Sequence, residues 1–102
     1  MYKHLVMWKL KDEANGKTKE ENAKEMKIRL ESLPAVIKEI KQYEVGINIG
    51  KYEASFFDIG LLSSFENKDD FWAYTKYPEH DEVLAFIQSV QSDEQIVDYE
   101  QE

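Results

Sequence analysis

The chain has 102 residues, 21 acidic against 13 basic side chains, a net charge of −8 at pH 7, and no cysteine. This length suffices for one domain, which we expect to span residues 1–102, and the acidic balance argues against nucleic acids and anionic membrane surfaces as partners. Without cysteine there are no disulfides or thiolate metal sites, and no apolar run can span a bilayer, so the composition predicts a cytoplasmic protein.

The first predicted element is a strand over residues 2–10. Its alternation places Val6 and Trp8 on one face and Leu5 and Met7 on the other, so both faces are largely apolar. A strand with one face in water shows only one apolar face. We therefore expect this strand to be covered on both sides.

A polar connection with an Asn15-Gly16 turn signal leads to the first predicted helix. Thr18 begins this helix, and Glu21 three residues later completes a capping box. Pro34 ends it, because the residue before a proline resists helical geometry. The apolar stripe of this helix comprises Ala23, Met26, Leu30 and Leu33.

Two further strands follow, over residues 43–49 and 56–65, with a turn or hairpin loop at 50–55 between them. Asn67 then caps a short helix that runs up to Tyr77 and carries Phe71, Trp72 and Tyr74. Pro78 suits the first position of a third helix, whose inward residues are expected to be Val83, Leu84, Ile87 and Val90. The last predicted strand covers residues 96–99.

This order of elements, β-α-β-β-α-α-β, predicts an α+β fold: a ferredoxin-like antiparallel sheet with helices on one face. The first and third strands carry apolar side chains on both faces, but helices cover only one. The uncovered face needs a partner. We expect a homodimer in which two sheets pack face to face as a dimeric α/β barrel; a monomer with a patchy exposed sheet face is the alternative.

Several short motifs occur in order along nearly the whole chain. They are Lys3-His4-Leu5-Val6, Leu33-Pro34, Ser64-Phe65-Glu66, Tyr74…Tyr77-Pro78-Glu79-His80 and Val97-Asp98-Tyr99. Together they resemble the stress-responsive A/B barrel (Dabb) family, a set of dimeric α+β barrels. The resemblance implies the same ferredoxin-like subunit and barrel dimer that the order of elements predicts.

The family also includes a plant branch, olivetolic acid cyclase, that closes a linear polyketide by a cofactor-independent aldol reaction. Its catalytic tyrosine and histidine match Tyr74 and His80, and the family's histidine in the first strand matches His4. The chain departs from the cyclase where aromatic residues line that enzyme's pocket, because it has Met26 there, and it has Trp8 in place of a smaller aliphatic residue. The polyketide substrate is therefore not carried over.

Tyr74 and His80 have two interpretations. As a catalytic pair, His80 would remove a proton beside a carbonyl and the Tyr74 hydroxyl would stabilise the developing enolate oxygen. As a structural pair, they would hydrogen-bond to the backbone or to each other at a helix bend set by Pro78. Substrate-binding positions are predicted at His4, Val6, Trp8, Met26, Leu61 and Ser63.

No other motif indicates a cofactor or a metal site, and we expect neither. The chain lacks a helical pair of histidines at metal-ligand spacing and has no phosphate-binding glycine loop. By resemblance to some plant members, backbone carbonyls of Leu30, Leu33 and Val36 remain a possible cation site. The sequence predicts a Dabb-type homodimer that binds a small, partly apolar molecule between sheet and helices; the alternative is a cofactor-independent lyase, cyclase or monooxygenase.

Overall fold

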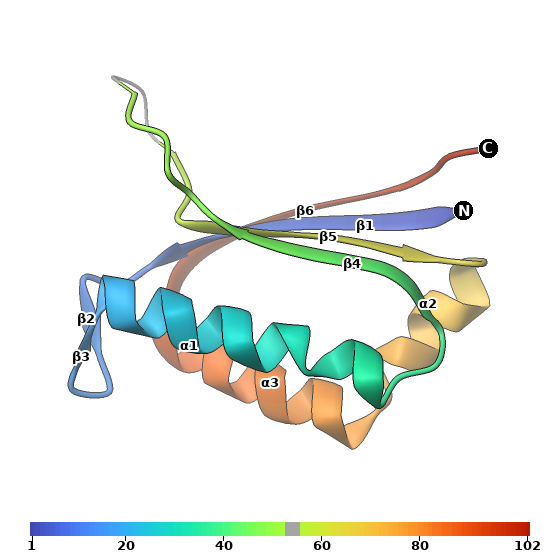
Figure 1. Ribbon diagram of the computed structural model, residues 1–102, viewed down its shortest axis with the longest axis horizontal. Helices are drawn as coiled ribbons and strands as arrows, with labels where there is room; N and C mark the ends of the chain where they lie inside the picture. Colours follow the sequence, from blue (N-terminus) through green and yellow to red (C-terminus); the bar gives the residue numbers. More distant parts are fainter. Residues whose placement is uncertain (53–55) are drawn as a thin grey trace.

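The computed structural model describes residues 1–52 and 56–102 and shows a four-stranded antiparallel sheet with the helices on one of its faces (Figure 1). The strands are β1 (Tyr2–Leu10), β4 (Ile40–Ile47), β5 (Ile59–Phe65) and β6 (Gln91–Glu100), in the order β4-β5-β1-β6. The helices are α1 (Lys19–Glu31), the 3-10 turn η1 (Leu33–Ala35), α2 (Lys68–Tyr74) and α3 (Pro78–Val90). This topology confirms the predicted ferredoxin-like α+β fold.

The sequence did not predict a small hairpin that precedes α1. Its strands β2 (Glu13–Ala14) and β3 (Lys17–Thr18) flank the expected turn, at which Asn15 and Gly16 both adopt positive φ. This conformation suits Asn and Gly better than other residues. The buried Asn22 side chain donates to the Ala14 carbonyl oxygen at 3.0 Å, which fastens the hairpin to α1.

The helix starts agree with the capping signals. The Thr18 hydroxyl accepts from the Glu21 amide at 3.2 Å while the Glu21 carboxylate accepts from the Thr18 amide at 3.0 Å, so the predicted capping box is confirmed. Asn67 caps α2 by accepting from the Asp70 amide at 2.9 Å. Pro78 occupies the first turn of α3, as predicted. By contrast, α2 ends at Tyr74, before the predicted Tyr77, because the chain must turn ahead of the proline.

Strand boundaries agree less well with the predictions. β4 covers Ile40–Ile47, where residues 43–49 were expected, and β5 begins at Ile59 where residue 56 was expected. β6 covers Gln91–Glu100, much longer than the predicted 96–99, because its polar first half pairs through the backbone with the end of β1. The expected loop at 50–55 includes residues 53–55, which lie outside the described residues.

Antiparallel pairing sorts the sheet into two faces, since directly paired residues point to the same side. Toward the helices, Val6 lies between Leu61 and Ile96. Toward the opposite face, Leu5 lies between Leu62 and Val97. The inner face is the buried core, whereas no described helix covers the outer face (Figure 1).

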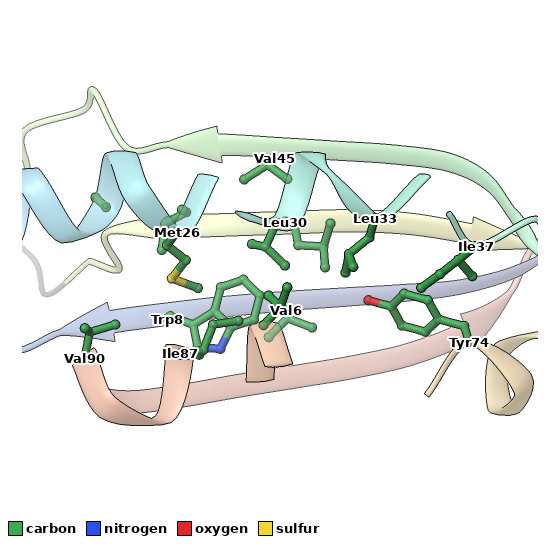
Figure 2. Packing of buried hydrophobic residues seen from close by; sticks show 14 of the residues in the cluster. Val6, Trp8, Met26, Leu30, Leu33, Ile37, Val45, Tyr74, Ile87 and Val90 are labelled. Carbon is green, nitrogen blue, oxygen red and sulfur yellow. The ribbon is translucent and has the colours of Figure 1, made fainter. Parts of the chain in front are cut away.

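The core fills the layer between the inner face and the helices (Figure 2). Val6 and Trp8 of β1 meet Met26 and Leu30 of α1, and Ile87 of α3 closes the other side. On α2, Phe71 is buried and Trp72 is 50% exposed, because the helix turns Phe71 inward and Trp72 outward. On α3, Leu84 was expected inward but is 36% exposed.

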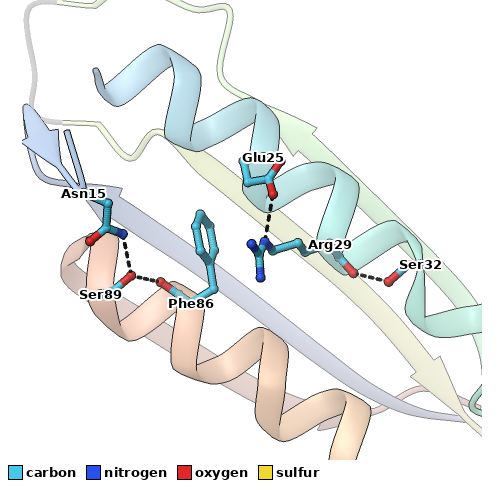
Figure 3. A network of polar contacts seen from close by, with 6 residues as sticks. All are labelled: Asn15, Glu25, Arg29, Ser32, Phe86 and Ser89. Atoms are coloured by element: carbon cyan, nitrogen blue, oxygen red, sulfur yellow. Dashed lines mark hydrogen bonds and ion pairs between the residues drawn. The ribbon is translucent and has the colours of Figure 1, made fainter. Parts of the chain in front are cut away.

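Polar contacts hold α1, α3 and the hairpin together at the surface (Figure 3). The Arg29 guanidinium lies 4.3 Å from the centroid of the Phe86 ring, and its Nε donates to the Glu25 carboxylate at 3.0 Å. The Asn15 amide donates to the Ser89 hydroxyl at 3.0 Å. These contacts hold α1 and α3 in place over the inner face of the sheet. No helix in the described part of the chain is long and apolar enough to cross a membrane.

Candidate functional site

A pocket of about 180 Å³ lies between the inner face of the sheet and the helices. Its walls are mostly aliphatic and aromatic, and its polar groups are two histidines, a tyrosine, a threonine and a glutamate. Both histidines of the chain belong to it. The lining residues are His4, Val6, Trp8, Leu30, Leu33, Leu61, Phe71, Tyr74, Thr75, His80, Val83, Leu84, Ile87, Glu94 and Ile96.

The structure brings together most of the residues predicted for a site, namely His4, Val6, Trp8, Leu61, Tyr74 and His80. Met26 and Ser63 are not among the described lining residues. Met26 is fully buried in the core, and the Ser63 hydroxyl donates to the carbonyl oxygen of His4 at 3.2 Å. Ser63 shares the inner face with its sheet partner His4, and its hydroxyl supports the strand that carries His4.

Tyr74 and His80 meet across the break between α2 and α3. Tyr74 is the last residue of α2 and His80 lies in the first turn of α3, with Pro78 between them. Their ring centroids are 4.6 Å apart and the rings lie edge to face. The bend thus places both side chains on one pocket wall, although six residues on a continuous helix would separate them by about 240°.

The hydroxyl of Tyr74 has a partner that the sequence did not reveal. Tyr43 of β4 approaches it with 2.8 Å between the two hydroxyl oxygens. Burial raises the pKa of Tyr74 to about 12, and the hydrogen bond with Tyr43 acts in the opposite direction. Burial also raises the pKa of Tyr43, and its contact with Tyr74 adds to the effect. Either hydroxyl can be the donor of this hydrogen bond; when Tyr43 donates, the proton of Tyr74 is free for another acceptor.

His80 lies in an environment that favours its neutral form. Burial lowers the pKa of His80 below 6.5, the nearby Asp81 carboxylate opposes this shift, and His4 adds to it. Nδ1 of His80 is buried without a hydrogen-bond partner, with Asp81 4.0 Å away. The Nε2 atom of His80 is not buried in the same way, and no described residue forms a hydrogen bond with it. A neutral imidazole with an open nitrogen can accept or donate a proton.

The His4 imidazole is positioned by a hydrogen bond to an aspartate near the end of β6. Asp98, its direct partner in the sheet, accepts from His4 Nδ1 at 2.5 Å and from the Tyr2 hydroxyl at 2.7 Å. Burial and the bond to Asp98 raise the pKa of Tyr2 to about 12. Because a carboxylate only accepts, Nδ1 carries the hydrogen and Nε2 is the nitrogen left for a ligand.

The pocket opens between α3 and β6. Leu84 and Ile96, 36% and 55% exposed, mark this opening, and Glu94 lies beside Ile96 on the inner face of β6. Thr75 belongs to the lining, but its hydroxyl already donates to the Trp72 carbonyl oxygen at 2.7 Å. The mouth is therefore apolar with a single carboxylate.

Metal binding gains no support at this site. Among the described residues, no three His, Cys, Asp or Glu side chains gather in a way that could hold an ion. The carbonyl oxygens of Leu30 and Leu33, two of the three possible cation ligands, already accept backbone hydrogen bonds. Leu33 receives two, from Val36 at 3.0 Å and Ile37 at 2.9 Å.

Sequence reasoning missed Tyr43, Thr75, Glu94 and Asp98 as neighbours of the site. Two signals could have found the first and last. The alternation of the second predicted strand sets Tyr43 on the same face as its apolar residues, and antiparallel pairing of the first and last strands brings Asp98 opposite His4. Glu94 lies in the part of β6 that was not expected to be a strand.

Comparison with known proteins agrees with this architecture. The sequence profile of the "Stress responsive A/B Barrel Domain" family matches residues 2–101. A Bacteroides fragilis protein, described as dimeric, ferredoxin-like and of unknown function, is 33% identical, with 98% of this chain and 95% of that chain covered and a TM-score of 0.83. Comparison with curated protein sequences gives no significant match.

More distant structures share the fold. A dimeric ferredoxin-like protein of unknown function from Thermobifida fusca is 24% identical, with coverage of 96% and 88% and a TM-score of 0.82. Hydroxynitrile lyase from Passiflora edulis is 16% identical, with coverage of 96% and 90% and a TM-score of 0.77. At these identities the likeness concerns the fold alone.

Proposed function

Since this chain belongs to the stress-responsive A/B barrel (Dabb) family, we propose that it acts as a homodimer that binds a small, partly apolar molecule in the pocket between sheet and helices. The observation that carries this proposal is the pocket itself: an apolar space of about 180 Å³ with two histidine rings in its wall. A well-packed protein interior leaves few voids larger than a water molecule. An apolar pocket on which a few polar groups converge is the usual form of a ligand site.

The pocket sets the size of its ligand. An engineered apolar cavity of about 150 Å³ is known to hold benzene, and this pocket is slightly larger. A molecule with one ring or a short branched chain therefore fits. One polar group on that molecule would find the open Nε2 atoms of His4 and His80.

The dimer proposal rests on the outer face of the sheet. Leu5 and Leu62 lie side by side there, and Met7 and Val97 remain exposed in a single protomer. Monomeric proteins rarely leave such an apolar face open to water. The Bacteroides fragilis relative, with the same fold, is described as dimeric.

Ligand binding can be tested through Trp8, because it lines the pocket and the chain has only one other tryptophan, the exposed Trp72. In a Trp72→Phe background, titration with benzyl alcohol should give a saturable change in Trp8 fluorescence. Ile96→Phe, which narrows the mouth, should weaken binding at least about tenfold, whereas Ile28→Phe on the exposed side of α1 should not. A non-saturable response, or one indifferent to Ile96→Phe, would contradict the proposal.

A second candidate function is cofactor-independent acid–base catalysis, favoured by the contact between Tyr74 and His80. In this reaction Nε2 of neutral His80 removes a proton from the carbon beside a carbonyl. The Tyr74 hydroxyl donates to the enolate oxygen, and the Tyr43 hydroxyl, 2.8 Å away, can donate to Tyr74 in turn. Return of the proton to carbon closes the cycle without a cofactor.

This candidate predicts hydrogen–deuterium exchange at the methyl group of acetophenone in deuterated buffer. The protein should accelerate exchange, His80→Ala should abolish the acceleration, and Tyr74→Phe should reduce it by roughly 10²-fold or more. Equal exchange rates with the native protein and with His80→Ala would remove catalysis and leave binding as the function.

A further inference from the structure

We propose that the pocket selects neutral molecules with one ring and a hydroxyl or carbonyl group, and that it rejects carboxylates of the same size. This inference rests on the proposed ligand-binding function and names the class of ligand. The supporting observations are the charged groups around the pocket and the histidine Nε2 atoms that have no hydrogen-bond partner among the described residues.

The described lining contains no lysine and no arginine. Its only carboxylate is Glu94, which lies on the inner face of β6 directly opposite Trp8. A second carboxylate, Asp98, lies behind His4 and is its hydrogen-bond partner. The fixed charges nearest to a bound ligand are therefore negative.

The two histidines do not offset this balance. His80 is drawn toward its neutral form by burial, which lowers its pKa, and any positive charge on His4 is matched by Asp98 at 2.5 Å. A carboxylate entering the pocket would lose its hydration without meeting an uncompensated cation. It would also be repelled by the partly buried Glu94 carboxylate in the pocket lining.

A neutral hydroxyl or carbonyl group meets no such barrier. A ligand hydroxyl can donate to the open Nε2 of His4, whose hydrogen is held on Nδ1 by Asp98. The ring of the ligand would lie among the apolar walls formed by Trp8, Leu61 and Ile87. The pocket can therefore satisfy a neutral polar group on a ligand whose ring is buried among the apolar walls.

The test compares benzyl alcohol with benzoate, which share a ring and differ in charge. In the Trp72→Phe background at neutral pH and constant ionic strength, Trp8 fluorescence should report benzoate binding at least about tenfold weaker than that of benzyl alcohol. Glu94→Gln should narrow this difference by strengthening benzoate binding. Glu20→Gln, which removes the same charge from an exposed position on α1, should leave both affinities unchanged.

The outcomes separate the two proposals. If neither probe binds, the ligand-binding function itself fails. If both bind and benzoate is as tight as benzyl alcohol, binding stands and the selection of neutral ligands is overturned. If Glu94→Gln and Glu20→Gln act alike on benzoate, Glu94 has no part in the selection.

Discussion

At the scale of single residues, the chemistry of the pocket depends on the position and the burial of Tyr74 and His80. Pro78 breaks the helical path so that Tyr74 and His80 share one wall, with 4.6 Å between their ring centroids. Burial favours the neutral imidazole of His80 and the protonated phenol of Tyr74, because both charged forms would lose hydration. A neutral base beside a protonated donor is the state that the proposed acid–base catalysis requires.

The first prediction concerns the titration of His80. Its midpoint in an NMR pH titration of the imidazole hydrogens should lie below 6.5, since burial opposes protonation more strongly than Asp81 favours it. Asp81→Asn removes the nearest opposing charge and should lower the midpoint further. A midpoint above 6.5 in the native protein would show that His80 is not buried as described.

The second prediction is the linked effect on stability. Because the folded state lowers the pKa of His80, the unfolded chain binds this proton more readily. The free energy of unfolding contributed by the neutral ring is therefore complete above about pH 6.5 and falls as the pH drops toward the folded-state pKa. Urea unfolding can be measured at about pH 7.5 and about pH 5.5. Between these two pH values, the free energy of unfolding should fall more for the native protein than for His80→Gln. Equal losses would disprove the linkage.

The third prediction concerns the pair of hydroxyl groups of Tyr43 and Tyr74. Tyr43→Phe should lower the free energy of unfolding by about 1–3 kcal/mol, because it leaves the buried Tyr74 hydroxyl without its partner. The double variant Tyr43→Phe/Tyr74→Phe should cost less than the sum of the two single changes. Additive losses in chemical denaturation would mean that the two hydroxyls do not interact.

At the scale of elements, the local signals were the most reliable. The capping box at Thr18 and the cap at Asn67 are satisfied by the hydrogen bonds that their side chains predict. Strand ends were less predictable, because pairing with another strand decides them. The first half of β6 has no apolar alternation, yet it forms a strand since β1 extends far enough to pair with it.

The candidate site was partly predictable for the same reason. His4, Tyr74 and His80 stand in recognisable motifs, and all three line the pocket. Tyr43 and Glu94 have no motif, because their place near the pocket results from strand register and not from sequence spacing. Met26, predicted to bind substrate, lies on the same helical stripe as Leu30 but is packed inside the core.

The fourth prediction tests the start of α1. Thr18→Ala should lower the free energy of unfolding by about 1 kcal/mol, because the Glu21 amide loses its acceptor. Thr18→Ser keeps the hydroxyl and serves as the control. Thermal or urea unfolding that fails to distinguish Thr18→Ala from Thr18→Ser would contradict the role of this cap.

At the scale of the whole molecule, the sheet has one face roofed by helices and one face open in a single protomer (Figure 1). The fifth prediction follows from this asymmetry. Light scattering at low micromolar concentration should give a mass near twice 12.0 kDa. Val97→Lys, on the open face and 49% exposed, should shift the mass toward 12.0 kDa, whereas Ile28→Lys on α1 should not. A native mass near 12.0 kDa would refute the dimer.

The open face of the sheet is proposed to form the dimer, whereas the face covered by helices encloses the pocket of the proposed function. The most direct test is a crystal structure of the native protein, determined from a crystal soaked in benzyl alcohol. We expect one molecule between α3 and β6, with its ring among the apolar walls and its hydroxyl within hydrogen-bonding distance of Nε2 of His4 or His80. A pocket that remains empty at saturating benzyl alcohol, or a molecule bound elsewhere, would contradict the account.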